Sequence, residues 1–272
     1  MFFNRQRLCR AVPVTATAVA MLFVSLHAQA PAPAKAPAEA KPAAVDPALP
    51  APRDVIDRHV KAIGGREAVL SHKSAHATGT FSVPSSGMVG TIETFGAANP
   101  DRVLVRITIP GLGEMANGFD GSHGWAVTPM TGPMLQQGKE LDQTRLDADF
   151  YGELRDPKKY ASMKTLEKTT FEGRPCYKLS LVRKDGNEDF EFYDVDSGLR
   201  AGSINTRESP MGTVTTTSVE TDYKKFGNLL QPTTLVQKMM GVEQKLTLSS
   251  IEYDTVSPSV FDLPPPIKAL IK

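Results

Sequence analysis

The chain has very little cysteine: Cys9 and Cys176 are its only thiols among 272 residues. Cys9 lies in an N-terminal segment that we expect to be removed, so the mature chain cannot form an internal disulfide. Its stability must therefore come from a packed core. Cys176 lies in a strand-like run over residues 175–181, and we expect it to be an inert, packed thiol.

An excess of one charge sign is also missing. The sequence has 31 Lys and Arg residues against 30 Asp and Glu residues, a formal net charge of +1. The N-terminal segment holds three arginines and no acidic residue, so its removal takes the net charge from +1 to about −2. A nearly neutral chain has no electrostatic footprint for nucleic acid or an anionic membrane surface. We therefore expect no nucleic-acid partner.

Motifs for covalent catalysis are absent as well. Ser122 and His123 are adjacent in a turn that begins with Asp120, and chain neighbours in a turn seldom form a nucleophile–base pair. The sequence has no Gly-x-Ser-x-Gly elbow and no phosphate-binding loop. We predict no catalytic residues and do not expect an enzyme.

Metal-binding patterns are weak. His72 and His76 are four residues apart, but the predicted helix ends near Ser71, so they do not share a helical face. The segment 185–196 resembles a calcium loop, yet its glycine stands at the second position and the bidentate glutamate is missing. A hairpin turn at Asp185-Gly186 explains that segment better. We predict no metal site and no cofactor.

The first thirty residues have the pattern of a secretory signal. Three arginines precede an uncharged apolar stretch over residues 11–26, and Ala28-Gln29-Ala30 supplies a small-x-small cleavage pattern. The stretch is shorter than the ~20 residues that span a bilayer. We expect cleavage after about Ala30, a periplasmic location and no integral membrane segment in the mature chain. An uncleaved anchor is the alternative.

Composition divides the remainder into two parts. Residues 31–52 are almost entirely Ala and Pro, with little to bury, and predict a disordered or extended linker that acts as a spacer or a passive tail. Residues 53–272 show no second linker, so we interpret them as one domain.

This domain begins with a helical pattern. Asp54 is the predicted helix cap, apolar residues recur at helical spacing from Val55 to Ile63, and Gly64-Gly65 interrupts the pattern. Strand patterns follow over residues 75–83, 88–96, 102–109 and 115–119. The clearest is 102–109, because alternate residues define two faces. One face carries Val103, Val105, Ile107 and Ile109, and the other carries Arg102, Leu104, Arg106 and Thr108.

A long excursion separates these strands from a second set. Residues 130–138 are irregular and 140–154 predict a helix, and an excursion of roughly 25 residues is typical of a lid or a binding element. Strand patterns resume over 177–181, 190–192, 199–207, 212–223, 230–240 and 244–253. We expect roughly nine to eleven strands with sequential antiparallel pairing and two helices. A sheet of that size must curl or close.

Apolar surface is the remaining candidate for function. Alternating faces on two strands, together with a few Met and Trp residues, suit a pocket for apolar ligands. The candidate ligand-binding residues are Val103, Val105, Ile107, Ile109, Trp125, Met130, Met134, Tyr177, Leu179 and Leu181. For each of them, packing in a filled core is the alternative.

Several segments also occur in a familiar order across residues 53–265. After the signal and the Pro/Ala spacer come a helix ending in AIGG, the segment GFDGSHGW, the hairpin FEFYDVDSGL and the closing FDLP. In this order the chain resembles the bacterial LolA/LolB-like superfamily of outer-membrane lipoprotein-sorting proteins and their periplasmic relatives. The resemblance implies a mainly β fold, in which a few helices cover a strongly curved, antiparallel half-barrel sheet.

The resemblance further implies binding of acyl chains without covalent chemistry. It places Leu112 on a loop after the third strand, where LolB-like receptors contact lipid or membrane. The arginine that latches the lid of true carriers has no counterpart that we can place, and the lipid-attachment cysteine of anchored receptors is missing.

These observations lead to one functional hypothesis and one alternative. The hypothesis is a periplasmic, non-catalytic protein that binds a lipid, acyl chain or lipoprotein on the concave face of a curved sheet, with an envelope protein as a further partner. The alternative is a structural or interaction module of an envelope complex, with a filled core and no ligand.

Overall fold

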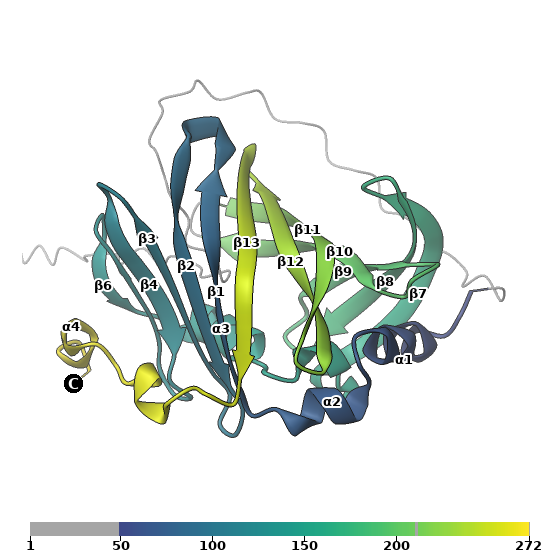
Figure 1. Ribbon diagram of the computed structural model, residues 1–272, viewed down its shortest axis with the longest axis horizontal. Coiled ribbons are helices and arrows are strands. Elements are labelled where there is room, and N and C mark those ends of the chain that lie inside the picture. The colour runs from purple at the N-terminus through teal and green to yellow at the C-terminus, as the bar shows by residue number, and fades with distance from the viewer. Residues whose placement is uncertain (1–48, 210–211, 272) are drawn as a thin grey trace, which may run out of the picture.

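The computed structural model describes residues 49–209 and 212–271. The predicted signal and most of the predicted linker lie outside these residues. Two helices open the described chain (Figure 1): α1 (Pro52–Ala62) and α2 (Arg66–Ser71). The residue before α1 is Ala51, so the prediction of Asp54 as cap was wrong. Asp54 lies instead in the first turn, where its charge favours the helix dipole.

The described strands form one antiparallel sheet. They are β1 (Ser74–Val83), β2 (Met88–Ala97), β3 (Arg102–Ile109), β4 (Gly113–Phe119), β5 (Gly124–Thr128), β6 (Gly132–Leu135), β7 (Tyr160–Phe171), β8 (Arg174–Arg183), β9 (Glu188–Asp194), β10 (Arg200–Ser209), β11 (Gly212–Phe226), β12 (Leu229–Met239) and β13 (Val242–Tyr253). The remaining elements are α3 (Gly138–Asp147), α4 (Pro265–Lys268) and the 3-10 turns η1 (Pro84–Ser86), η2 (Gly152–Leu154), η3 (Pro157–Lys159) and η4 (Pro258–Phe261).

The sheet order is β6-β5-β4-β3-β2-β1-β13-β12-β11-β10-β9-β8-β7. Consecutive strands pair, as predicted, within an N-terminal meander, β1–β6, and a C-terminal meander, β7–β13. β6 and β7 do not pair with each other, and the two meanders are joined by the pairing of β1 with β13. The sheet bends strongly without closing, and β6 and β7 form its two free edges (Figure 1).

Three sequence-based expectations need correction. The structure describes 13 strands, more than the predicted nine to eleven. β7 was not predicted, and β6 lies in the segment 130–138 that was predicted to be irregular. The helix predicted over 140–154 is α3, which ends at Asp147, and the chain continues through η2. Sparse apolar residues in this segment left the helix end undefined.

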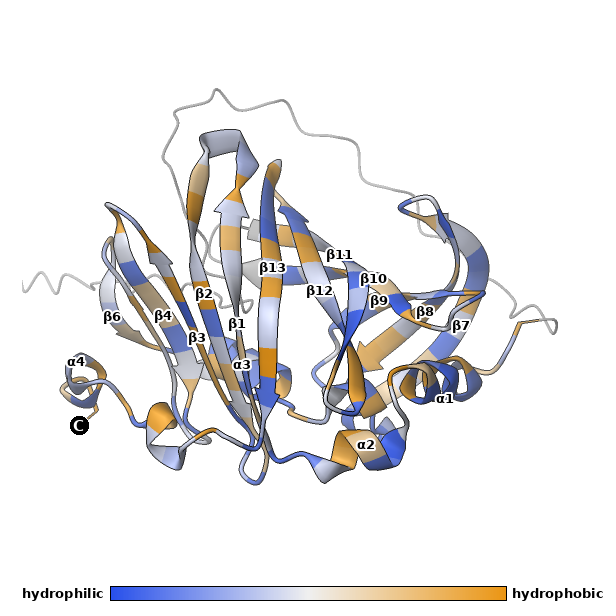
Figure 2. Ribbon diagram, in the orientation of Figure 1, coloured by the Kyte–Doolittle hydropathy of each residue, from blue (hydrophilic) through white to orange (hydrophobic). Residues whose placement is uncertain are grey.

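The strand register assigns every alternating side chain to one of two faces. We define the inner face as the one that carries Val105, Ile107, Leu179 and Glu191, which the register connects strand by strand. α1 packs on this face. Residues 136–150, which we call the α3 segment, lie against the same face at Gly96 and Gly124. The alternation is visible in Figure 2 as changing hydropathy along single strands.

The outer face has its own apolar packing. Phe95, Leu104 and Trp125 pack there with Phe261 and Ile267 from the C-terminal segment. A second outer cluster lies on the C-terminal meander and contains Cys176, which is fully buried as expected. Burial raises the pKa of this thiol, which keeps it in the less reactive protonated form.

Candidate functional site

The inner face divides into an apolar and a polar half. The apolar half lies on the N-terminal meander and β13, and its buried members are Phe81, Val83, Ile92, Val105, Ile107, Ile109, Met115 and Leu246. All of these residues belong to strands, and within the described chain no helical residue is part of this cluster. These side chains are only 0–7% exposed, so the strands of the curved sheet bury them without a helix.

The C-terminal meander is covered differently. Val55, Ile56 and Val60 of α1 pack against Leu179, Leu181 and other inner-face residues. The spacing of the α1 residues places them on one helical face, as the sequence predicted. This part of the inner face is therefore filled by the protein's own helix.

Beyond that helix the C-terminal meander carries a buried ion network, which we call the polar half. Its carboxylates are Glu153, Asp189, Glu191 and Glu220, and its guanidinium groups are Arg155, Arg183, Arg200 and Arg207. Each carboxylate pairs with at least one arginine, because an unpaired charge at this depth would be costly.

Arg155 and Glu191 form the most enclosed pair. Arg155 donates from Nη2 and Nε to Oε1 of Glu191 at 2.6 and 3.0 Å, and the Tyr193 hydroxyl donates to Oε2 at 2.6 Å. Arg155 also has φ of 46°, a left-handed conformation that costs a non-glycine residue about 1–3 kcal/mol. The bidentate pair stabilises this strained position.

Arg200 links this pair to α1. It donates to Glu220 and Glu153, while Glu153 also binds Nε2 of the buried His59 at 3.0 Å. The backbone N–H of Arg200 donates to Nδ1 of the same ring. In the neutral histidine the proton is therefore on Nε2, where it donates to Glu153.

The arginines overcome the effect of burial on these acids. Burial alone would raise the pKa of Glu153 and Glu191, but Arg200 and Arg155 hold both pKa values below the usual range. Asp147 at the end of α3 differs, because burial outweighs its contact with Arg183 and raises its pKa. The negative charges at the centre of the network are thus well compensated by arginines, whereas the charge of Asp147 at the end of α3 is less well compensated.

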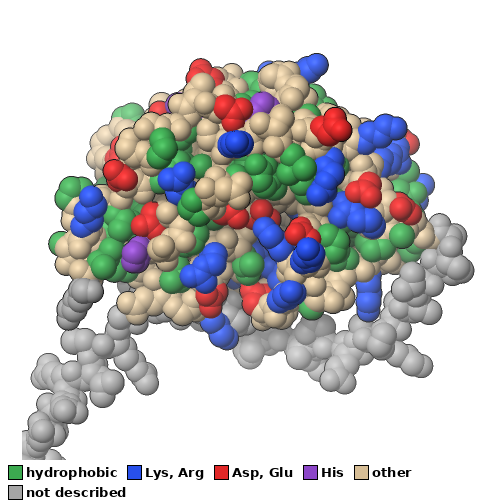
Figure 3. All heavy atoms as spheres, turned by 90° about the horizontal axis from the view of Figure 1, so that it is seen from below, with side chains coloured by type: hydrophobic (Ala, Val, Ile, Leu, Met, Phe, Trp, Pro, Cys, Tyr) green, Lys and Arg blue, Asp and Glu red, His purple; other side chains and the backbone are tan. Residues whose placement is uncertain are grey.

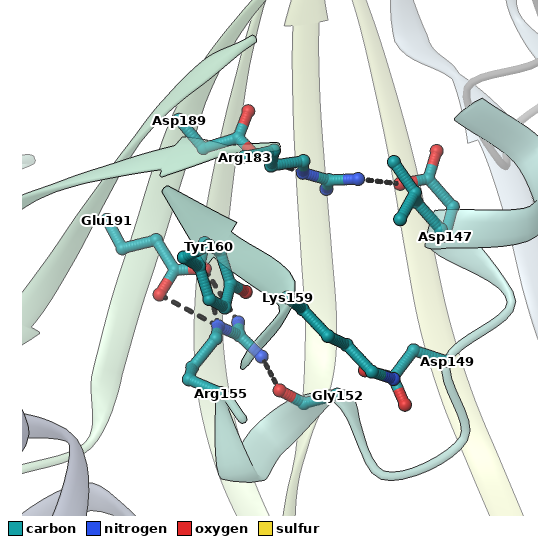
Figure 4. A pocket seen from close by; sticks show the side chains of 10 residues that line it. Asp147, Asp149, Gly152, Arg155, Lys159, Tyr160, Arg183, Asp189 and Glu191 are labelled. Carbon is teal, nitrogen blue, oxygen red and sulfur yellow. Dashed lines mark hydrogen bonds and ion pairs between the residues drawn. The ribbon is translucent and has the colours of Figure 1, made fainter. Parts of the chain in front are cut away.

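A pocket of about 150 Å³ opens beside the network (Figure 4). Its charged lining includes Asp149 with Lys159, Asp147 with Arg183, and Glu191 with Arg155. In the close-up each of these cations points toward a carboxylate of the protein. The cations are already paired, so the pocket carries no free charge for a ligand of one sign.

The α3 segment spans the two meanders. Before α3, the backbone N–H of Gln136 donates to the carbonyl oxygen of Gly124 on β5, and at its end Asp147 pairs with Arg183 on β8 at 3.1 Å. Thr144 is the one fully buried side chain of α3. Gln136, Gln143 and Thr144 have buried polar atoms without hydrogen-bond partners. α3 therefore rests on polar contacts, unlike α1.

The predicted binding residues fall into several places. Val105, Ile107 and Ile109 belong to the apolar half, and Val103 packs against it. Leu179 and Leu181 lie under α1, with Tyr177 packed against that cluster. Trp125 lies on the outer face.

The other predicted residues lie near the N-terminal edge of the sheet. Met134 on β6 pairs with Ala126, and the register places it on the inner face. Met130 is exposed between β5 and β6, and Leu112 is exposed between β3 and β4. The N–H of Leu112 donates to the carbonyl oxygen of Ile109 across a turn in which Gly111 has φ of 82°, as a Pro-Gly turn requires.

The segments that resemble catalytic or calcium-binding motifs are turns in which a side chain accepts backbone hydrogen bonds. Asp120 accepts the N–H groups of Ser122 and His123, which lowers the pKa of Asp120 despite burial. Asp185 accepts the N–H of Asn187 in the predicted hairpin turn. Within the described residues no group of three or more His, Cys, Asp or Glu side chains could hold a metal ion. None of the described helices is long and apolar enough to cross a membrane.

Comparison with known proteins identifies the fold. No family model matches the chain, and no curated protein matches it. Among solved structures, it is similar to a DUF1329 family protein from Desulfovibrio piger, with 13% identity, a TM-score of 0.54 and coverage of 78% of this chain and 97% of that one.

Two further structures are described as a LolA superfamily protein and as a lipoprotein-sorting domain. A LolA superfamily protein from Nitrosomonas europaea has 13% identity and a TM-score of 0.52, covering 79% of this chain and 99% of that one. An outer membrane lipoprotein-sorting protein domain from Vibrio parahaemolyticus has 12% identity and a TM-score of 0.50, covering 77% and 95%. The chain thus has the LolA/LolB-like fold that the order of its sequence segments indicated.

Proposed function

We propose that the protein is a periplasmic, non-catalytic binding protein that holds an acyl chain of a lipid or lipoprotein on the apolar half of its inner face. One observation carries this proposal: the apolar half is built from strands alone, whereas α1 fills the inner face of the C-terminal meander. An acyl chain would insert among these strand side chains without having to displace a helix. The gain would be about 0.8 kcal/mol for each methylene group buried.

The likeness to lipoprotein-sorting structures supports the same reading through the fold. Binding would need no covalent step, because the acyl chain is held by apolar contact alone. The proposed contacts are Val103, Val105, Ile107 and Ile109. Leu179, Leu181 and Trp125 serve instead to hold α1 and the C-terminal segment in place.

Leu112 lies on the turn that directly follows this surface along the chain. It follows Ile109, a member of the apolar half, by three residues and is 42% exposed. We propose that it contacts the lipid from which the acyl chain is taken or to which it is delivered.

The test is binding of a fluorescent fatty-acid probe to the mature protein, with lipid extraction and native mass spectrometry of periplasmic material. Val103→Asp places a charge on the inner face of β3, and we expect probe affinity to fall at least about tenfold. Thr108→Asp is the matched control, because Thr108 is exposed on the outer face of the same strand. It should bind the probe as the wild type does.

A second variant guards against loss of folding. Val103→Phe keeps the surface apolar at a half-buried position, and we expect it to shift preference toward shorter chains while circular dichroism stays unchanged. Wild-type protein that carries no lipid and binds no probe between about 12 and 18 carbons would reject acyl-chain binding. It would leave the interaction module as the better account.

A further inference from the structure

The pocket beside the polar half contains acceptor atoms that the chain leaves unused. In the Asp147 carboxylate, Oδ1 accepts from Gln143 and Arg183, whereas no hydrogen bond from the described chain reaches Oδ2. Asp149 likewise pairs with Lys159 through Oδ2 alone, at 2.7 Å. Both carboxylates line the pocket. Each therefore has an oxygen atom that can accept a hydrogen bond from a ligand.

Unused donors line the same pocket. Arg183 donates from Nε to Asp189 and from Nη1 to Asp147, which leaves its Nη2 group without a partner among the described residues. The Lys159 ammonium carries three N–H bonds and pairs only with Asp149. Donors and acceptors are thus both available, on α3, the loop that follows it, η3 and β8.

Tyr160 supplies the most distinctive of these groups. It begins β7, its ring packs against the cluster under α1, and no residue of the described chain hydrogen-bonds to its hydroxyl. Burial raises the pKa of this hydroxyl, and Arg155 and Glu191 are close enough to affect it. In Figure 4 the side chain lies beside the Arg155–Glu191 pair. A half-buried hydroxyl of this kind needs water or a ligand to complete its hydrogen bonds.

Ion pairs hold the unused groups in place. The Asp147–Arg183 pair joins the end of α3 to β8, and the Asp149–Lys159 pair joins the loop after α3 to η3. Side chains that are already ordered lose little entropy when a ligand arrives. The pocket is therefore preorganised for hydrogen bonding.

The balance of charge selects against an ionic ligand. The lining contains the four carboxylates Asp147, Asp149, Asp189 and Glu191 and the three cations Arg155, Lys159 and Arg183. An anion would meet the carboxylates, and an amine would meet the cations. The face of the molecule that carries α1 and α2 also intersperses acidic and basic side chains (Figure 3), so it provides no field of one sign. A neutral ligand that both donates and accepts hydrogen bonds suits the unused atoms.

We propose that this pocket binds a neutral polyhydroxylated group, either a polyol or a single sugar ring. Its hydroxyl groups would donate to Asp147 and Asp149 and accept from the Tyr160 hydroxyl and the free N–H groups beside it. The volume of about 150 Å³ equals that of roughly five water molecules at ~30 Å³ each, which limits the ligand to one small ring. No lining residue belongs to the apolar half, so this inference goes beyond acyl-chain binding and does not rest on it.

Tyr160→Phe tests the proposal without disturbing the fold. The hydroxyl has no partner in the described part of the chain, so the melting temperature should stay the same or rise slightly. NMR titration of the wild type with myo-inositol and with glucose should show millimolar binding of at least one, with amide shifts centred on Gly152 and Lys159. We expect Tyr160→Phe to weaken that binding about three- to tenfold, because one neutral hydrogen bond is lost.

Tyr177→Phe is the matched control. Tyr177 is half-buried against the same cluster, and its hydroxyl also has no partner among the described residues. It lies on β8 roughly 20 Å along the strand from Arg183, outside the pocket. This variant should bind both probes as the wild type does. An equal loss in the two variants, or wild-type protein that binds neither probe, would overturn the proposal.

Charged probes test the class of ligand. Inorganic phosphate, ethanolamine and phosphoethanolamine should each bind more weakly than the better neutral probe. Binding of the neutral probe should also persist when salt rises from about 0.05 to 0.5 M, since it involves no net charge. A charged probe that binds as tightly as the neutral one would overturn the assignment to a neutral ligand.

Octyl glucoside, used at monomeric concentrations, distinguishes two sources of the sugar. Affinity at least about tenfold above that of glucose, and lowered by Tyr160→Phe, would assign the pocket to the headgroup of a glycolipid. Equal affinity would assign it to a free sugar. Tyr160→Phe should retain the fatty-acid probe, and Val103→Asp should retain the neutral probe. Failure of this proposal is therefore distinct from failure of acyl-chain binding.

Discussion

The two halves of the inner face bury their side chains in different ways. In the C-terminal meander α1 and a dense ion network occupy the inner face, and nearly every group there has a partner within the chain. In the N-terminal meander the inner face is aliphatic and its cluster includes no helical residue from the described chain. One curved sheet thus combines a half that a helix and an ion network fill with a half whose apolar side chains are buried by strands alone, where we propose that the acyl chain binds.

The largest expected effect comes from breaking the polar half. Arg155→Ala leaves Glu191 buried without its main partner, and we expect the free energy of unfolding to fall by about 3–5 kcal/mol. Urea denaturation would measure this loss. Replacing both residues, Arg155→Met with Glu191→Leu, should restore much of the stability. A double variant as unstable as the single one would show that the loss of stability does not come from leaving Glu191 unpaired.

Leu179→Ala tests whether packing under α1 and binding of the fatty-acid probe are independent. Leu179 is fully buried beneath α1, so truncation should leave a cavity and cost about 2–5 kcal/mol. Fatty-acid probe affinity should not change, because the proposed binding surface lies on the other half. A parallel loss of probe affinity, with the variant still folded at the assay temperature, would remove the functional distinction between the halves.

The α3 segment that joins the halves should respond to pH through Glu140. Burial raises the pKa of this carboxyl from its ordinary 4.5 to about 7, against a weaker contact with Gln136. Ionisation is therefore less favourable in the folded state, and stability declines as pH rises from about 4.5 through 7. Because Glu140 is partly exposed, we expect Glu140→Gln to gain only about 1 kcal/mol at pH 8, and almost nothing at pH 4.5.

Melting temperatures of the wild type and Glu140→Gln at these two pH values would check the prediction. A constant difference at both values would mean that the amide acts by packing and not by removal of a buried charge.

The smallest effect is expected at the end of the sheet where β1 and β13 meet α2. His72 lies 2.7 Å from Asp254 and 2.6 Å from Asn228, and these contacts outweigh burial and raise its pKa above 6.5. The protonated ring stabilises the folded state fully below about pH 6.5, and this contribution is lost as pH rises through the raised pKa. Asp254→Asn should flatten that decline by less than about 1 kcal/mol. A pH profile identical to that of the wild type would assign the decline to other groups.

Much of the meander could be predicted, because its strands alternate and its turns carry strong signals. Strand β3 has aliphatic residues at every second position, and Asp185-Gly186 clearly marks the hairpin between β8 and β9. Strand β7 was missed because Lys164, Glu167 and Lys168 interrupt any alternation. Two bulges in its pairing with β8 further shift the pattern.

The polar half could not be predicted from the sequence. In β9, Asp189 and Glu191 alternate with Phe190 and Phe192, a pattern that normally places the charges in water and the aromatic rings in the core. The structure buries Asp189 and Glu191 on one face and Phe192 on the other, where Phe190 is half-buried. Asp189 pairs with Arg183 and Arg207 from other strands, and Glu191 pairs mainly with Arg155, which follows η2. Only the folded chain brings these partners together.

The pairing of β1 with β13 also defines how the chain must assemble. Every other ladder joins strands that follow one another among the described residues, whereas Thr78 and Ser249, which meet at 3.2 Å, are 171 positions apart. The two meanders can form from local hairpins, but this seam requires closure of a very long loop and its entropy. The seam should therefore form late during folding, and the aliphatic inner strands beside it would stay open until the last strand has emerged.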